Sequence, residues 1–440
     1  MVSKKDSPQL TDNFLFPKIF QTFRMAIQPT KLIIAFLAVF IICLAGWIMD
    51  HLSKTVVTDN QGLMTELQVY MTNPDQVESY IDSFAQTGGR AGVFSTLWRF
   101  GSAKFHAALN ELFELNLASV AKNIAEYFKA IGWAVKYHFI YWVIFVVIKL
   151  AVISVAGGAV CRIAALQFAQ GEKPGLTEAL RFSTKRFTSF FTAPLAPLGI
   201  IIFIGLFIFL LGLIGNIPVA GELIMGICML LALIAGALIA VVLIGAVAGF
   251  NLMFPSVAYD GSDCFDAISR SFSYVYAKPW QMLFYSVIAA IYGAICYIFV
   301  RFFAFLLFSV TYWFLKLGVL GDNSKLAAIW PGSSFTMLVG PLEDLLPAAN
   351  WSQSVALFLI YLCLLVVIGF VVSFIISFYF SANTIIYSLM RNKVDDTALE
   401  EIYTPSDETE TEPTTTESKS EETQPQTDSE AQSDSPPPQE

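Results

Sequence analysis

The chain alternates between long apolar stretches and shorter polar connections. Six apolar stretches begin near Lys31, Lys136, Pro194, Glu222, Gln281 and Trp351. About 20 apolar residues in a helix cross the hydrocarbon core of a bilayer, and a helix satisfies its own backbone hydrogen bonds there. The pattern therefore predicts an all-α, multi-pass membrane protein with about six transmembrane helices, whose first partner is the lipid bilayer.

The polar connections divide the chain into five regions. We expect a cytoplasmic amphipathic N-terminus (1–31), a first span (32–49), an extracytoplasmic helical segment (50–136), a five-span membrane domain (137–400) and an acidic tail (404–440). Apolar residues 302–315 continue past the fifth span. The pattern leaves open whether they extend that helix or lie along the membrane interface.

Lysine and arginine are distributed unevenly among the connections. Fourteen of the 26 fall in residues 1–31, in the loops 162–192 and 259–280, and at the end of the last span, whereas the loop 316–350 holds two. Because cytoplasmic loops carry an excess of cations, we expect both termini in the cytoplasm and the protein in the inner (plasma) membrane.

The net charge of −9 belongs to the C-terminal tail. Residues 404–440 contain eleven carboxylates and a single cation, Lys419. Almost no apolar residue accompanies them, so the tail cannot bury enough surface to offset its ordering entropy, and we expect it to be disordered. It serves either as a solvated tether or as an acidic segment that binds a partner.

A short motif recurs in two of the loops. The pattern Glu/Asp-Ala-Leu/Ile-x-x-Ser begins at Glu178 and again, 88 residues later, at Asp266. Each copy follows an even-numbered span and opens an amphipathic helix, which suggests a duplicated span–helix–span unit; two unrelated loop helices are the alternative. In the first copy we expect the cations Arg181, Lys185 and Arg186 to face lipid headgroups.

The arrangement of span, glycine-containing loop and this motif, over about residues 140–300, resembles the glycerophosphodiester phosphodiesterase membrane-domain-like superfamily. Separately, the end of the last span (380–387, with Arg391) and Phe23-Arg24 ahead of the first resemble uncharacterised multi-pass membrane proteins of planctomycete-type bacteria. These resemblances imply a multi-pass fold. The soluble phosphodiesterase barrel that accompanies some members of the superfamily is absent from this sequence, so the resemblance does not imply hydrolase activity.

Three polar residues in or beside the spans are candidates for function. Lys149 lies near the middle of the second span, where a charge costs ~2.5–3.5 kcal/mol on insertion scales, so it either has a function or snorkels. Arg301 follows the fifth span, and an interfacial anchor is the main alternative there. Asn251, with Pro255, is expected to interrupt the end of the fourth span, either as broken helices do near transporter sites or as an ordinary helix end at the membrane surface.

Small residues recur along the fourth span, among them Gly236, Gly245 and Gly249. Such spacing lets helices approach closely, either within the chain or in a homo-oligomer. No nucleotide-binding, catalytic or metal-ligand motif is recognisable, so we expect no cofactor, no metal, no nucleic-acid partner and no enzymatic activity.

Three functions remain open from the sequence. The first is a non-enzymatic membrane scaffold or assembly component, with a protein partner or a second copy of itself. The second is a transporter of small molecules or lipids that uses Lys149, and the third is an enzyme acting on lipid headgroups.

Overall fold

The computed structural model describes residues 15–60, 62, 64–319, 326, 330 and 351–404. Predictions for residues 1–14, for most of the loop 316–350 and for the tail after Thr404 lie outside the described residues. Two compact units are separated at Ile402, and everything below concerns the first, Met1–Ile402.

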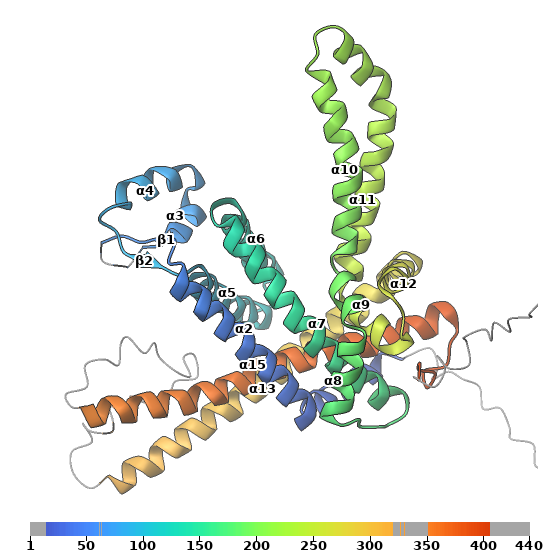
Figure 1. Ribbon diagram of the computed structural model, residues 1–440. Helices are drawn as coiled ribbons and strands as arrows, with labels where there is room; N and C mark the ends of the chain where they lie inside the picture. The colour runs from blue at the N-terminus through green and yellow to red at the C-terminus, as the bar shows by residue number, and fades with distance from the viewer. Residues whose placement is uncertain are drawn as a thin grey trace, which may run out of the picture. The chain divides into compact units, whose positions relative to one another are not determined.

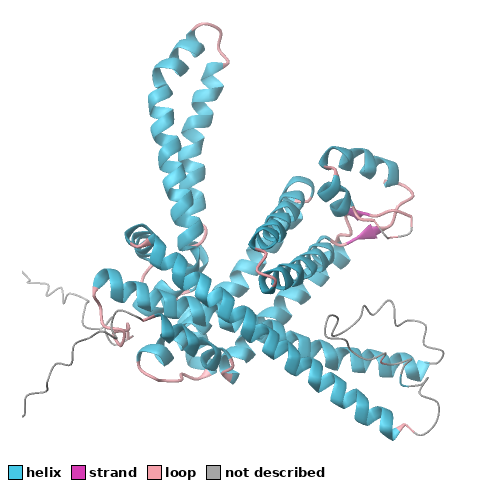
Figure 2. Cartoon of the chain, turned by 180° about the vertical axis from the view of Figure 1, so that it is seen from behind, coloured by secondary structure: helices cyan, strands magenta, loops and turns pink. Residues whose placement is uncertain are grey.

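The predicted all-α fold is confirmed, and the described chain is almost entirely helical (Figure 2). Its elements are η1 (Phe16–Gln21), α1 (Thr22–Ala26), α2 (Pro29–Leu52), β1 (Val56–Val57), α3 (Glu66–Thr72), η2 (Pro74–Gln76), α4 (Val77–Phe84), β2 (Arg90–Ala91), α5 (Val93–Phe113), α6 (Leu117–Tyr137), α7 (Phe139–Ala169), α8 (Leu176–Lys185), α9 (Phe187–Thr192), α10 (Ala196–Gly215), α11 (Ala220–Asp260), α12 (Cys264–Ala277), α13 (Pro279–Gly318) and α15 (Trp351–Asp395).

Six helices in the described part of the chain are long and apolar enough to cross a membrane: α2, α7, α10, α11, α13 and α15. The protein is therefore a multi-pass membrane protein. Three of the six, α11, α13 and α15, are 40 to 45 residues long. Since a 20-residue helix already spans ~30 Å, each of them continues well beyond the hydrocarbon core. Residues 302–315 extend the fifth span, because α13 is continuous to Gly318.

The predicted interruption at Asn251 and Pro255 is wrong. Helix α11 continues through Pro255 to Asp260, and Gly261, which adopts the left-handed conformation with φ +63°, caps its end. An internal proline removes one backbone hydrogen bond and costs ~3 kcal/mol. Residues 252–259 are buried against α7, α12 and α15, and this packing outweighs the loss.

The segment between the first two spans is helical, as expected, but it also contains a small antiparallel sheet. Strand β1 pairs with β2 in the register Val56↔Ala91. Asp50 at the end of α2 accepts hydrogen bonds from the backbone N–H groups of Phe94 (2.9 Å) and Ser95 (2.8 Å), so it caps the first turn of α5. Trp133 of α6 lies fully buried in the core of this segment.

The C-terminal part of α15 lies at the centre of the membrane domain. Every residue from Phe380 to Arg391 is buried, and the helix contacts α1, α2, α7, α11, α12 and α13 (Figure 1). A helix that is enclosed on all sides needs its polar side chains paired. Its buried polar residues therefore determine where the neighbouring helices attach.

The two motif-bearing helices each pack the alanine and serine of the motif against the span before them. In α8, Ala179 and Ser183 are buried against α7, and in α12, Ala267 and Ser271 are buried against α11. The Ser183 hydroxyl donates to the carbonyl oxygens of Ser154 (3.0 Å) and Val155 (2.7 Å). In both helices the small residues of the motif permit the close contact.

Candidate functional site

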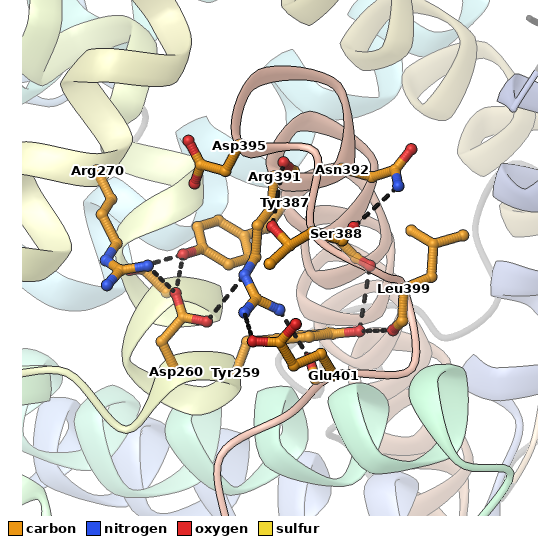
Figure 3. A network of polar contacts seen from close by, with 12 residues as sticks. Tyr259, Asp260, Arg270, Tyr387, Ser388, Arg391, Asn392, Asp395, Leu399 and Glu401 are labelled. Atoms are coloured by element: carbon orange, nitrogen blue, oxygen red, sulfur yellow. Dashed lines mark hydrogen bonds and ion pairs between the residues drawn. The ribbon is translucent and has the colours of Figure 1, made fainter.

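A polar network joins the ends of α11, α12 and α15 (Figure 3). Its centre is Asp260, the last residue of α11, whose side chain is only 6% exposed. Arg270 of α12 and Arg391 of α15 each approach this carboxylate to 3.3 Å. The Tyr387 hydroxyl donates to the same carboxylate. One buried anion therefore holds three helices together.

Arg270 and Tyr274 of α12 are four residues apart and share one face, and Lys278 directly follows the helix. Tyr274 donates to Asp395 Oδ2 at 2.5 Å, and Lys278 Nζ donates to the Lys393 carbonyl oxygen at 2.6 Å. Burial, followed by the hydrogen bond to Asp395, raises the pKa of Tyr274. The phenol therefore remains a hydrogen-bond donor throughout the physiological pH range.

The network also binds the segment that follows α15. Arg391 Nη1 donates to the Glu401 carbonyl oxygen at 2.7 Å, and Asn392 Nδ2 donates to the Thr397 carbonyl oxygen at 2.9 Å. The Tyr259 hydroxyl donates to the carbonyl oxygen of Leu399. Residues 397–401 are therefore folded back onto the ends of α11 and α15 before the acidic tail begins.

A second polar cluster lies where α2, α7 and α15 meet. Lys31 is fully buried, and its ammonium nitrogen lies 3.0 Å from Gln167 Oε1 and 3.4 Å from Ser381 Oγ. No carboxylate pairs with it among the described residues. The sequence identified Lys31 only as one cation of the basic N-terminus, since nothing in the local pattern shows that its partners lie 136 and 350 residues away.

The three candidates in or beside the spans do not converge. Lys149 is exposed on α7 and makes no hydrogen bond or ion pair with any described residue. Asn251 accepts a hydrogen bond from the Tyr379 hydroxyl of α15 at 2.5 Å. Arg301 is buried within α13, and it lies 3.0 Å from His106 Nε2 of α5 and 3.2 Å from the Tyr297 hydroxyl.

The candidate cations of α8 lie on its outer side. Arg181 and Lys185 are exposed, and Arg186 is half-buried at the junction with α9. The apolar face of α8 packs against protein rather than lying free for lipid.

The histidine beside Arg301 is affected by that cation. Burial, then the charge on Arg301, lowers the pKa of His106, so this imidazole is mainly neutral at neutral pH.

The glycines of α11 fall into two groups. Gly245 and Gly249 lie against Phe272 and Ser271 of α12, so they serve packing within the chain. Gly236 has no neighbour within 4 Å of the place where a side chain would begin. Its surroundings among the described residues are open.

The polar network attaches helices to one another. No group of three or more His, Cys, Asp or Glu residues in the described part of the chain is arranged to hold a metal ion. The buried carboxylate of Asp260 is surrounded by cations and a phenol that bind it in place. This arrangement is typical of a structural network.

Comparison with known proteins gives no relative. No protein-family model matches the chain. No curated protein matches it, and no solved structure does. The resemblance to the glycerophosphodiester phosphodiesterase membrane-domain-like superfamily and to the planctomycete-type proteins therefore stays a prediction.

Proposed function

We propose that this protein is a non-enzymatic scaffold or assembly component of the plasma membrane, with both termini in the cytoplasm. The supporting observation is how little of the span surface the chain covers by itself. In the most apolar window of each span, α10 and α11 have no buried residue, and the best-covered span, α7, has 33% buried. Apolar surface left uncovered in the bilayer is available to lipids and to other membrane helices.

The hairpin of α10 and α11 has the least covered spans of the six. The two helices lie side by side (Figure 1). From Phe187 to Tyr259 the only charged residue in the sequence is Glu222. Large side chains such as Phe203 (62% exposed) and Leu230 (69% exposed) point away from the partner helix. A protein partner or a second copy can pack against these faces without burying a charge.

A transporter is favoured less by this arrangement. Its spans would be expected to surround a polar path, and an intramembrane charge would face that path. The exposed position of Lys149 instead suits a side chain that reaches along the helix to the interface. The polar contacts of Asn251 and Arg301 serve to join helices.

Photo-crosslinking in native membranes tests the proposal. A photoreactive amino acid replaces Phe203 on α10 or, in a second variant, Leu230 on α11. We expect both variants to give the same protein adduct, either with a second copy or with one identified membrane protein. Phe190, which is fully buried, provides the matched negative control. If both exposed positions crosslink to lipid alone, the scaffold proposal is wrong.

A further inference from the structure

The connection between α7 and α10 carries its positive charge on its outer side. Both flanking helices are candidate spans, so the connecting helices α8 and α9 lie at a membrane surface. Ser183 fixes one face of α8 to α7 through its two hydrogen bonds. Arg181 and Lys185 are four residues apart and exposed, so they share the other face.

The second copy of the motif uses its cations differently. Arg270 of α12 turns inward to Asp266 (3.0 Å) and Asp260 (3.3 Å), and Lys278 donates to the Lys393 carbonyl oxygen. At the positions 88 residues after Arg181 and Lys185, the second copy has Ser269 and Ser273. The exposed cations at these two positions therefore belong to the first copy alone.

Two aromatic side chains of α9 follow these cations in the chain. Phe187 and Phe191 of α9 stack with ring centroids 5.4 Å apart, and both are half-buried. They follow directly after Lys185 and Arg186 in the chain. Cations beside partly exposed apolar rings are the combination by which surface helices meet lipid headgroups and the tops of acyl chains together.

We propose that Arg181 and Lys185, together with the stacked rings of α9, form a binding site for the phosphate headgroup of an anionic phospholipid. A cation near an anionic membrane surface contributes roughly a fivefold gain in affinity. Glu178 is exposed on the preceding turn and offsets part of that gain. Removal of both cations is therefore expected to weaken lipid binding about tenfold, which is less than the product of two independent effects of roughly fivefold each. The site requires that α7 and α10 span the membrane, and it does not require the scaffold role.

Native mass spectrometry of the full-length protein in detergent tests this proposal. The protein is titrated with dioleoyl phosphatidylglycerol and, separately, with dioleoyl phosphatidylcholine. The variant Arg181→Ser/Lys185→Ser gives the first copy the residues of the second. We expect about tenfold weaker binding of phosphatidylglycerol, unchanged binding of phosphatidylcholine and an unchanged melting temperature. Each single substitution should weaken phosphatidylglycerol binding by a smaller factor, which separates the site from a folding defect.

The matched control is Lys122→Ser/Lys129→Ser, which removes two exposed cations of α6. It should leave phosphatidylglycerol binding unchanged. The proposal is overturned if the α8 variant binds phosphatidylglycerol as tightly as the natural protein, or if the α6 variant loses as much. Competition by millimolar glycerol 1-phosphate, which has no acyl chains, would show a site for free phosphate and would also overturn the lipid assignment.

Discussion

Replacement of Asp260 by alanine should destabilise the membrane domain far more than replacement of Arg270. The side chains of Asp260 and Arg391 are 6% and 10% exposed, so water screens their interaction little. Removal of one partner from a buried ion pair costs ~3–5 kcal/mol. In Asp260→Ala, Glu401, whose side chain is 62% exposed, is the one anionic partner that Arg391 keeps among the described residues. We therefore expect a loss of ~4 kcal/mol in the free energy of unfolding.

Arg270→Ala is the matched control, because the Arg270 side chain is 38% exposed and Asp260 retains Arg391 and Tyr387. An exposed ion pair contributes less than ~1 kcal/mol. SDS-induced unfolding in mixed micelles, followed by tryptophan fluorescence, measures both variants. Equal losses for the two variants, or a loss below ~1 kcal/mol for Asp260→Ala, would refute the role of Asp260 as the buried centre of the network.

Three further predictions follow from single contacts. Gly158→Ala should destabilise by ~1–3 kcal/mol, since the new carbon would lie 2.5 Å from Ser183 Oγ, whereas Gly236→Ala, with nothing within 4 Å, should be neutral in the same unfolding assay. The folded-state pKa of His106 lies below its ordinary value of 6.5, so the unfolded chain takes up the proton more readily than the folded protein. The free energy of unfolding is therefore at its full value above pH 6.5 and declines as the pH falls through the folded-state pKa. Melting curves at pH 5 and 7.5 should show this decline, and His106→Gln should reduce it. Lys31→Met should have a melting temperature no lower than that of the natural protein. The reason is that an apolar side chain of similar length replaces a buried amine that lacks a carboxylate partner among the described residues. A large fall in melting temperature would show that the hydrogen bonds of the amine are essential.

Apolar length alone was sufficient to predict the number of spans. The stretches near Lys31, Gln281 and Trp351 correspond to α2, α13 and α15, because nothing but a helix can hold such residues in a bilayer. The positions of the helix ends were harder to predict from the sequence. Beyond the hydrocarbon core, tertiary packing decides how far a helix continues, as in the second half of α13.

The polar network was not predictable, because its partners are far apart in the chain. Asp260 and Arg391 are separated by 131 residues, and neither has a local pattern that identifies the other. A local contact is different: Asp263 stands directly before α12, a position typical of a helix cap, and its side chain accepts from the Asp266 N–H at 2.9 Å. The two-residue strands β1 and β2 are too short for alternation to indicate them.

Accessibility of two engineered cysteines to a membrane-impermeant maleimide tests most directly whether the chain crosses the membrane as described. Lys122→Cys on α6 follows the first span, and Lys185→Cys on α8 follows the second; both positions are exposed, and the naturally exposed Cys363 is replaced by serine in the background. We expect intact cells to label position 122 only, with position 185 labelled after lysis. Labelling of both positions in intact cells, or of position 185 alone, would contradict this account.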